Sequence, residues 1–155
     1  MAITTANQIA DYFIWLANES GSFVSNLKLQ KLVYYAQAWY LALYDGQPLF
    51  DEDFEAWIHG PVIPALYQEY KSFSWKPILK EVEKPKFTQE VNDFLEELTE
   101  VYFGYDGFEL EKMTHREDPW INARGDIPAD EPSNAIIPKE AMREYYQERA
   151  ETEED

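Results

Sequence analysis

The sequence predicts a mainly α-helical fold: one compact globular domain of about six helices around a buried central helix, with at most a minor β-hairpin. Three observations predict it. The run LKLQKLVYYAQAWYLALYDGQPL, from Leu27 to Leu49, is typical of a helix that is apolar on nearly every side, which other elements must cover. A length of 155 residues suits one domain. Aromatic residues make up 16% of the chain, far too many for a disordered chain.

The first two helices have clear start and stop signals. Residues 5–8 (TANQ) have the form of a capping box, and apolar residues follow at helical spacing until Gly21. Ser25 or Asn26 can cap the central helix, which is expected to end at Asp45-Gly46. We therefore expect the central helix to fill most of residues 26–45.

A short extended piece and a third helix are expected next. Residues 54–58 have an extended character that Gly60-Pro61 interrupts, because the residue before a proline is pushed out of the α region. Pro64 is well placed in the first turn of a helix. Residues 74–86 are expected to form a linker over the surface.

The C-terminal half adds three more helices. Thr88 caps an amphipathic helix that ends before Gly104, and a short helix over residues 108–115 leads to a turn at Pro119-Trp120. Residues 126–138 contain three prolines and are expected to be irregular, with a short strand near residues 135–137. Pro138 begins the last helix. We predict one domain over residues 1–146 and an acidic C-terminal tail over residues 147–155.

The charge of the chain bounds its partners. Thirty acidic and 13 basic residues give a net charge of -17, which repels nucleic acid and attracts a basic protein surface. Cysteine is absent, so no disulfide, thiolate nucleophile or cysteine-ligated zinc is expected. The N-terminal segment does not resemble a signal peptide, and no stretch is apolar enough to span a membrane. A cytoplasmic protein is therefore expected.

No pattern in the chain predicts an enzyme. The two histidines, His59 and His115, lack the spacing of a zinc protease, and the H-x-E sequence at His115 lacks the cysteines of a zinc deaminase. A nucleophile elbow, a P-loop and a dinucleotide fingerprint are also absent. We predict no catalytic residue, cofactor or metal.

Two segments combine unusual residues. Trp57 precedes His59-Gly60-Pro61, where the histidine is expected to fix a turn through backbone hydrogen bonds. In residues 114–124 (THREDPWINAR), Asp118 is expected to cap a turn and Trp120 to pack inward, with His115 tying the preceding helix to that turn. For Arg124, a structural role and a place in a groove that binds a partner are equally expected.

These runs resemble the Panacea domain, the SocA-like, phage-associated antitoxin family. The matching blocks are LKLQKLVYYAQ, GQPLF, EAWIHGPVIPALYQEY and MTHREDPWINAR, together with a late helix carrying Tyr145 and Tyr146. The resemblance runs from about Ala6 to Tyr146. Its residues that maintain the fold would be Leu29, Leu32, Tyr35, Gly60, Pro61, Pro119 and Trp120.

The resemblance implies the antitoxin half of a bacterial or prophage toxin–antitoxin pair. The partner would be a protein toxin, one that blocks translation such as an enzyme resembling small alarmone synthetases, neutralised by direct binding. A net charge of -17 suits a toxin with a basic surface. The expected partner-binding residues combine motif residues and aromatic anchors: Lys28, Lys31, Trp57, His59, Tyr70, Phe73, Trp75, His115 and Arg124. Tyr67 is expected in the core.

Three alternatives remain open at this point. The protein can be an adaptor that delivers a toxin to a cellular protease, as in the SocA branch of the family. It can be a small hydrolase that uses His59 or His115 with nearby carboxylates. It can also mimic nucleic acid, although that role needs two regular rows of carboxylates, which the sequence does not show.

Overall fold

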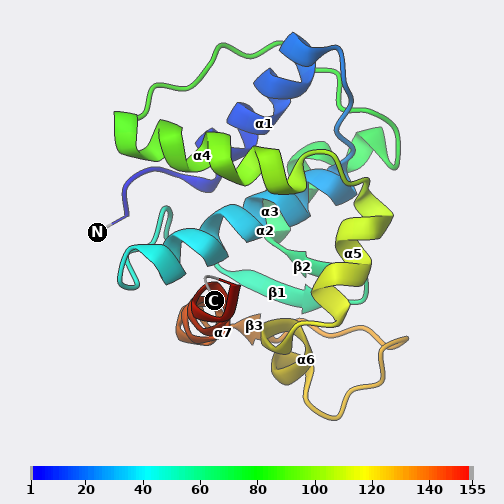
Figure 1. Cartoon of the computed structure of the whole chain (residues 1–155). Coiled ribbons are helices and arrows are strands. Elements are labelled where there is room, and N and C mark those ends of the chain that lie inside the picture. Colours follow the sequence, from blue (N-terminus) through cyan, green and yellow to red (C-terminus); the bar gives the residue numbers. More distant parts are fainter. Residues whose placement is uncertain (1, 154–155) are drawn as a thin grey trace.

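The computed structural model describes residues 2–153. Helices dominate this part of the chain, and the predicted mainly α class is confirmed (Figure 1). Seven α-helices form among the described residues, and the expected hairpin is extended by a third strand. The elements follow in the order α1 (Ala6–Ser20), α2 (Asn26–Leu43), β1 (Phe54–Trp57), β2 (Gly60–Val62), α3 (Pro64–Tyr70), η1 (Lys71–Phe73), α4 (Gln89–Tyr102), α5 (Gly107–His115), α6 (Asp118–Arg124), β3 (Ile136–Ile137) and α7 (Lys139–Glu153).

The first two helices begin where their caps predict. The hydroxyl of Thr5 accepts a hydrogen bond from the backbone N–H of Gln8, and α1 ends at Gly21, which has a left-handed φ of 67°. Ser25, rather than Asn26, caps α2 by accepting from the N–H of Lys28 at 3.2 Å. The backbone therefore turns sharply between the two helices at residues whose chemistry favours it.

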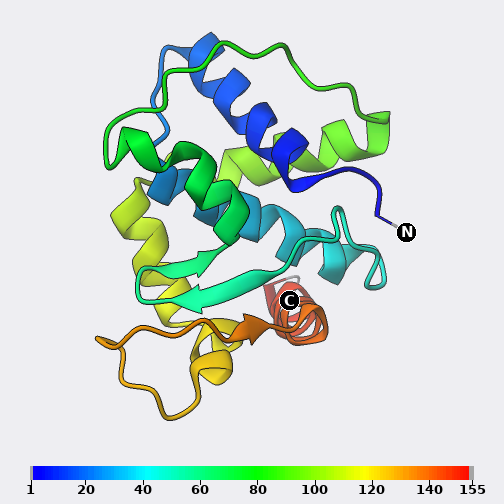
Figure 2. The ribbon, with the colours of Figure 1, turned by 180° about the vertical axis from the view of Figure 1, so that it is seen from behind.

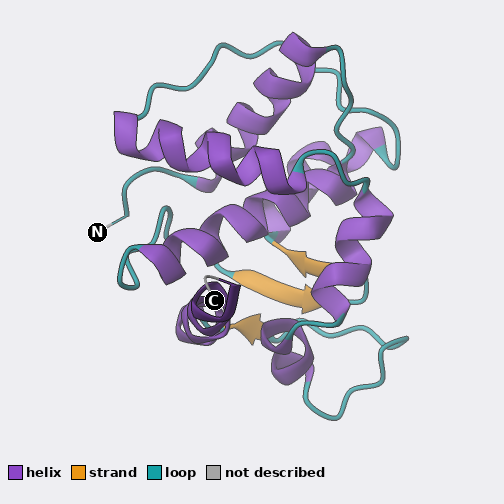
Figure 3. Ribbon diagram, in the orientation of Figure 1, coloured by secondary structure: helices purple, strands orange, loops and turns teal. Residues whose placement is uncertain are grey.

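The central helix α2 is surrounded as its sequence predicts. It contacts α1, α3, α4, α5, α7 and β2. In Figure 3, α1 and α4 lie on one side of α2, while the strands, α5 and α7 lie on the other. Only the last residue, Leu43, is largely exposed, at 52%. Burial of the remaining apolar side chains on α2 supplies much of the hydrophobic stabilisation of the domain.

The small sheet is antiparallel and has the strand order β2-β1-β3. Trp57 pairs with Gly60 across the hairpin, and Phe54 pairs with Ile137 on the other side. Side chains alternate along β1, so that Phe54 and Ala56 are buried while Glu55 and Trp57 stay half-exposed. One face of the sheet therefore completes the core, and the other face is open.

A long loop joins η1 to α4 over residues 74–88, as the sequence predicts. Seen from behind, it passes over the end of α1 (Figure 2). The backbone N–H of Ile78 donates to the carbonyl of Val24 at 2.9 Å, and the side chain of Asn18 donates to the carbonyl of Lys80 at 2.9 Å. These bonds hold the loop against the domain.

Two elements differ from the expectation. The expected turn at Pro119-Trp120 is the helix α6, in which Asp118 is the first residue and makes no side-chain cap. The last helix continues to Glu153, so residues 147–153 of the expected acidic tail are helical. Arg149 in this extension donates to the carboxylate of Glu117 at 2.6 Å. The position of the domain boundary itself stays a prediction.

Candidate partner-binding groove

Two buried glutamines of α2 hold the loops and strands that surround the open face of the sheet. Gln37 donates to the carbonyl of Phe50 at 2.7 Å and accepts from the N–H of Leu49 at 2.8 Å. Gln30 accepts from the N–H of Ile63 at 3.1 Å. Because both side chains bond to main-chain atoms, they fix the path of the backbone on either side of β1 and β2.

The next motif residue, Lys31, is fully buried against the β1–β2 turn. Its ammonium donates to the carbonyl of Pro61 at 3.2 Å. Burial lowers the pKa of Lys31 to about 7, and the nearby Glu111 carboxylate partly opposes this shift. Gly60 has a φ of 105°, and a Cβ there would lie 2.5 Å from Lys31 Cε and 2.9 Å from Thr114 Oγ1. The His-Gly-Pro sequence therefore makes room for the buried lysine.

These contacts also protect the free edge of β2. This strand has β1 as its only neighbour in the sheet formed by the described residues. On its outer side, the carbonyl of Pro61 accepts from Lys31, and the N–H of Ile63 donates to Gln30. An edge whose backbone groups are satisfied in this way does not invite another strand to pair with it.

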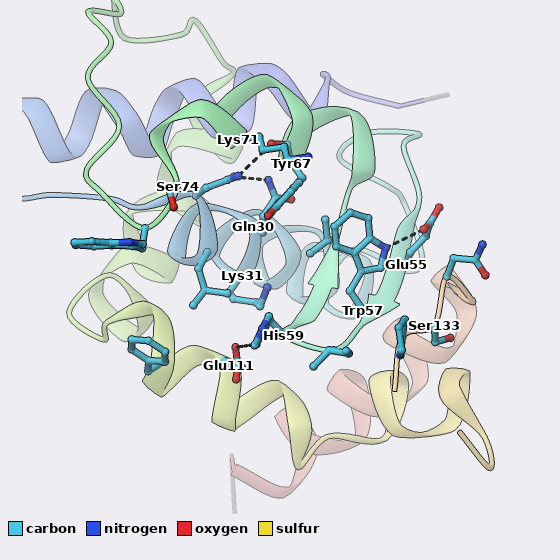
Figure 4. Close-up of a pocket in the computed structure, with 18 residues that line it drawn as sticks. Gln30, Lys31, Glu55, Trp57, His59, Tyr67, Lys71, Ser74, Glu111 and Ser133 are labelled. Atoms are coloured by element: carbon cyan, nitrogen blue, oxygen red, sulfur yellow. Dashed lines mark hydrogen bonds and ion pairs between the residues drawn. The ribbon is translucent and has the colours of Figure 1, made fainter. Parts of the chain in front are cut away.

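A groove of about 870 Å³ lies beside this edge and over the open face of the sheet (Figure 4). Its walls come from the N-terminal half of α2, the β1–β2 hairpin, the end of α3, the first turns of α5 and the loop before β3. The lining residues are Asn26, Leu27, Gln30, Lys31, Glu55, Trp57, Ile58, His59, Val62, Tyr67, Lys71, Ser74, Trp75, Phe108, Glu111, Pro132, Ser133 and Asn134.

Polar groups in the groove are paired with one another. His59 Nδ1 lies 2.9 Å from a carboxylate oxygen of Glu111, and its side chain is 72% exposed. The indole N–H of Trp57 donates to the carboxylate of Glu55 at 2.9 Å. The expected role of His59 in fixing the turn through backbone bonds is not what the structure shows, because its bond is to a side chain on α5.

Lys31, Trp57, His59 and Trp75 are the predicted partner-binding residues that line the groove. Others of the set lie outside it. Lys28 is buried, donates to the carbonyl of Phe103 at 2.6 Å and has its pKa lowered by burial. Tyr70 is buried beside Lys80, and Phe73 is half-buried in η1.

His115 and Arg124 also lie outside the groove, and both pack on Trp120. The imidazole of His115 stacks on the indole at 4.1 Å, and burial lowers its pKa. Buried Arg124 donates to the carbonyls of Ala56 at 2.8 Å, Pro128 at 2.7 Å and Glu131. The guanidinium therefore joins β1 to the loop after α6. The expected link from His115 to this turn is also observed.

The predicted structural residues are buried: Leu29, Leu32, Tyr35, Gly60, Pro61, Pro119 and Trp120. The sequence missed the partner of Tyr35. Its hydroxyl donates at 2.7 Å to Glu117, a buried carboxylate that also accepts from Tyr146 at 2.7 Å and Arg149 at 2.6 Å. Three donors satisfy the carboxylate and tie α2, α7 and the α5–α6 turn together.

Several groove residues were also missed. Leu27, Ile58, Val62, Phe108 and Glu111 line it without having been predicted, and Tyr67 lines it instead of lying in the core. Leu27, Ile58, Val62 and Tyr67 belong to the sequence blocks that carried the family resemblance, so those blocks contained a usable signal. Phe108 lies outside those blocks and gave no such signal, since an aromatic residue in a first helical turn is equally suited to the core.

Residues 29–121 match the family described as antitoxin SocA-like, Panacea domain. This chain belongs to the SocA-like Panacea family. A separate similarity is to Antitoxin SocA of Caulobacter vibrioides (strain NA1000 / CB15N), with 43% identity over 56 residues. That similarity covers 36% of this chain and 29% of the Caulobacter protein. No solved structure matches the chain.

The matched region of the Panacea family contains most of the groove. It covers the hairpin, α3, α5 and all but the first turn of α2. Within residues 2–153, no three histidine, aspartate or glutamate side chains gather as a metal site, and no helix is long and apolar enough to cross a membrane. What the groove offers is apolar contact area with a few polar groups, which is suited to binding.

Proposed function

We propose that this protein is the antitoxin of a bacterial or prophage toxin–antitoxin pair and that it neutralises its toxin by direct protein–protein binding. Membership of the SocA-like Panacea family carries the proposal. The similarity to a protein named Antitoxin SocA supports it, although that similarity spans under a third of the Caulobacter protein. The predicted domain, residues 1–146, would be the neutralising unit.

The charge of the chain favours a toxin with a basic surface. At a net charge of -17, long-range attraction would speed the encounter with a cationic partner. A toxin that acts in translation, for instance on RNA or a nucleotide, would need such a cationic surface, and the antitoxin would compete for it. We place this encounter in the cytoplasm, where translation occurs.

Binding rather than catalysis is favoured by the surroundings of the two histidines. His59 is exposed and bonded to Glu111, while His115 is stacked on Trp120 and has its pKa lowered by burial. Among the described residues, His59 is bonded to Glu111 and the hydroxyl of Thr114 donates to the carbonyl of Glu111, so neither histidine is paired with a hydroxyl as a base with its nucleophile would be. We therefore assign no reaction to the protein.

The deciding experiment is growth of cells that express the neighbouring gene of the native locus, with and without this protein. We expect toxicity from the neighbour alone and growth when both are expressed. A neighbour that is harmless, or that kills in both cases, contradicts the proposal.

The same cells separate the two routes of neutralisation. The amount of toxin, measured by immunoblotting after synthesis is stopped, is expected to persist in the presence of the antitoxin. A fall that requires a cellular protease would instead support the adaptor alternative.

A further inference from the structure

Two aromatic rings project into solvent at the mouth of the groove. Trp75, in the loop after η1, is 80% exposed, and Phe108, in the first turn of α5, is 71% exposed. Both line the same groove. Large apolar side chains gathered on one surface are typical of sites that a partner covers, and aromatic residues dominate the energy of such sites.

The deeper part of the groove continues the apolar surface. Trp57 and Tyr67 meet edge to face, with ring centroids 5.1 Å apart, and Leu27 and Val62 line the same groove. A partner segment can therefore bury several apolar side chains along one path. Such contacts must be made by side chains, because the outward carbonyl of Pro61 in β2 and the N–H of Ile63 just after the strand are already bonded to Lys31 and Gln30.

The charges of the groove favour a cationic residue in the same segment. Glu55 is bonded to the neutral indole of Trp57, and Glu111 is bonded to His59. Among the described residues, no lysine or arginine lies within ion-pair distance of either carboxylate. The two lysines that line the groove, Lys31 and Lys71, form no ion pair with Glu55 or Glu111. A lysine or arginine from a partner can thus supply the missing charge.

We infer that this groove is the toxin-binding site and that its occupant is a toxin segment carrying large apolar side chains next to a lysine or arginine. The apolar side chains pack between Trp75 and Phe108 and against Trp57 and Tyr67. The cationic side chain meets Glu55, whose carboxylate is bonded to a neutral indole, whereas Glu111 is bonded to His59. This inference rests on the proposed antitoxin function and adds to it the face of the molecule and the chemistry of the segment.

The apolar contact is tested with two double variants of the full chain. Trp75→Ala with Phe108→Ala removes the rings at the mouth, and Phe23→Ala with Leu79→Ala removes two side chains that are 68% and 78% exposed and do not line the groove. All four residues are largely exposed, so thermal unfolding is expected to change little. We expect the groove variant to raise the Kd for the purified toxin by about tenfold or more, and the control to leave it within about twofold.

The outcomes separate the two proposals. A groove variant that binds the toxin and restores growth like the natural protein overturns the groove while the antitoxin function stands. If the natural protein neither binds nor restores growth, the antitoxin function falls and the groove inference falls with it. Equal losses in the groove variant and its control also overturn the inference.

The charge contact has its own pair of variants. Glu55→Gln keeps an oxygen that accepts from Trp57, and Glu100→Gln makes the same charge change on the exposed face of α4. We expect Glu55→Gln to weaken toxin binding by about threefold or more and Glu100→Gln to have a smaller effect. Equal effects would show that only net charge matters and would overturn the cationic contact in the groove.

Discussion

At the scale of single residues, the buried amine of Lys31 lowers the stability of the folded protein when it is protonated. This amine is fully buried and donates a hydrogen bond to the carbonyl of Pro61, so the folded protein disfavours the protonated form. The pKa is about 7 in the folded state against about 10.4 in an unfolded chain. Between these values the unfolded state binds more protons, so stability rises with pH. The loss of stability caused by burying the protonated amine is fully present below pH 7.

We therefore expect Lys31→Met to change the pH dependence of stability. The free energy of unfolding of the variant should exceed that of the natural protein by the largest amount near pH 7. This difference should shrink by about 1.4 kcal/mol per pH unit above pH 7. Urea unfolding from about pH 7 to about pH 9 measures this, a range that stops short of tyrosine ionisation in the unfolded chain. Lys71→Met, at an exposed lysine of the same groove, should leave the slope unchanged. Parallel curves for all three proteins would contradict the assigned pKa.

Gly60 leaves the space that the side chain of the same lysine occupies. Gly60→Ala should destabilise the protein by about 2–4 kcal/mol, because the residue has a φ of 105° and the new methyl would lie 2.5 Å from Lys31 Cε. Gly104→Ala is the matched control, since nothing lies within 4 Å of its Cβ position. Its effect should stay within about 1 kcal/mol. Thermal and chemical unfolding of the two variants compare them directly.

The sequence could not separate exposed from buried aromatics at this scale. Trp39 and Trp120 pack inward while Trp75 faces solvent, yet all three are large apolar residues in or beside helices. Arg124 illustrates the reverse case. A guanidinium is usually exposed, and its burial depends on three carbonyls brought together by chain segments that no local pattern relates.

At the scale of elements, capping and periodicity predicted most helices. Thr5, Thr88 and Pro64 stand where α1, α4 and α3 begin. The patterns failed where tertiary contacts extend an element. The residues of α6 form only two turns and have no side-chain cap, so its helical state depends on the packing of Trp120. The two-residue strand β3 depends in the same way on its pairing with β1.

The end of α7 offers a test of the predicted domain boundary. Removing residues 147–155 deletes Arg149, which lies 2.6 Å from the buried carboxylate of Glu117. We expect this truncation to lower the free energy of unfolding by about 1–3 kcal/mol, and Arg149→Ala alone to cause most of that loss. Urea unfolding of both variants provides the comparison.

Glu151→Ala, at an exposed position of the same segment, is the control, and it should leave the free energy of unfolding nearly unchanged. If loss of residues 147–155 is equally harmless, the domain ends at Tyr146 as the sequence predicts. The acidic composition of this segment is typical of a solvated tail, whereas its helical conformation and the contact of Arg149 with Glu117 indicate otherwise.

At the scale of the whole molecule, the net charge of -17 should govern how fast the proposed toxin is bound rather than how long it stays bound. The association rate constant should fall steeply as salt rises, because screening weakens the long-range field. The dissociation rate constant should change much less. Stopped-flow or surface-plasmon measurements over a series of NaCl concentrations give both constants. An association rate that does not depend on salt would argue against electrostatic steering.

The aromatic groove variant provides a contrast in the same measurement. Replacing Trp75 and Phe108 leaves the charge unaltered, so the salt dependence of association should be preserved while dissociation becomes faster. A change confined to the association rate would place the effect of these rings in the encounter rather than in the bound complex.

The bonds from Gln30 and Gln37 have a consequence for how this protein can change over generations. Both glutamines form hydrogen bonds to main-chain atoms, which every amino acid has, at Leu49, Phe50 and Ile63. Mutations that alter exposed side chains such as Trp75 and Phe108 therefore leave these hydrogen bonds intact. The proposed toxin-binding surface can therefore change by mutation while the main-chain bonds beneath it are kept.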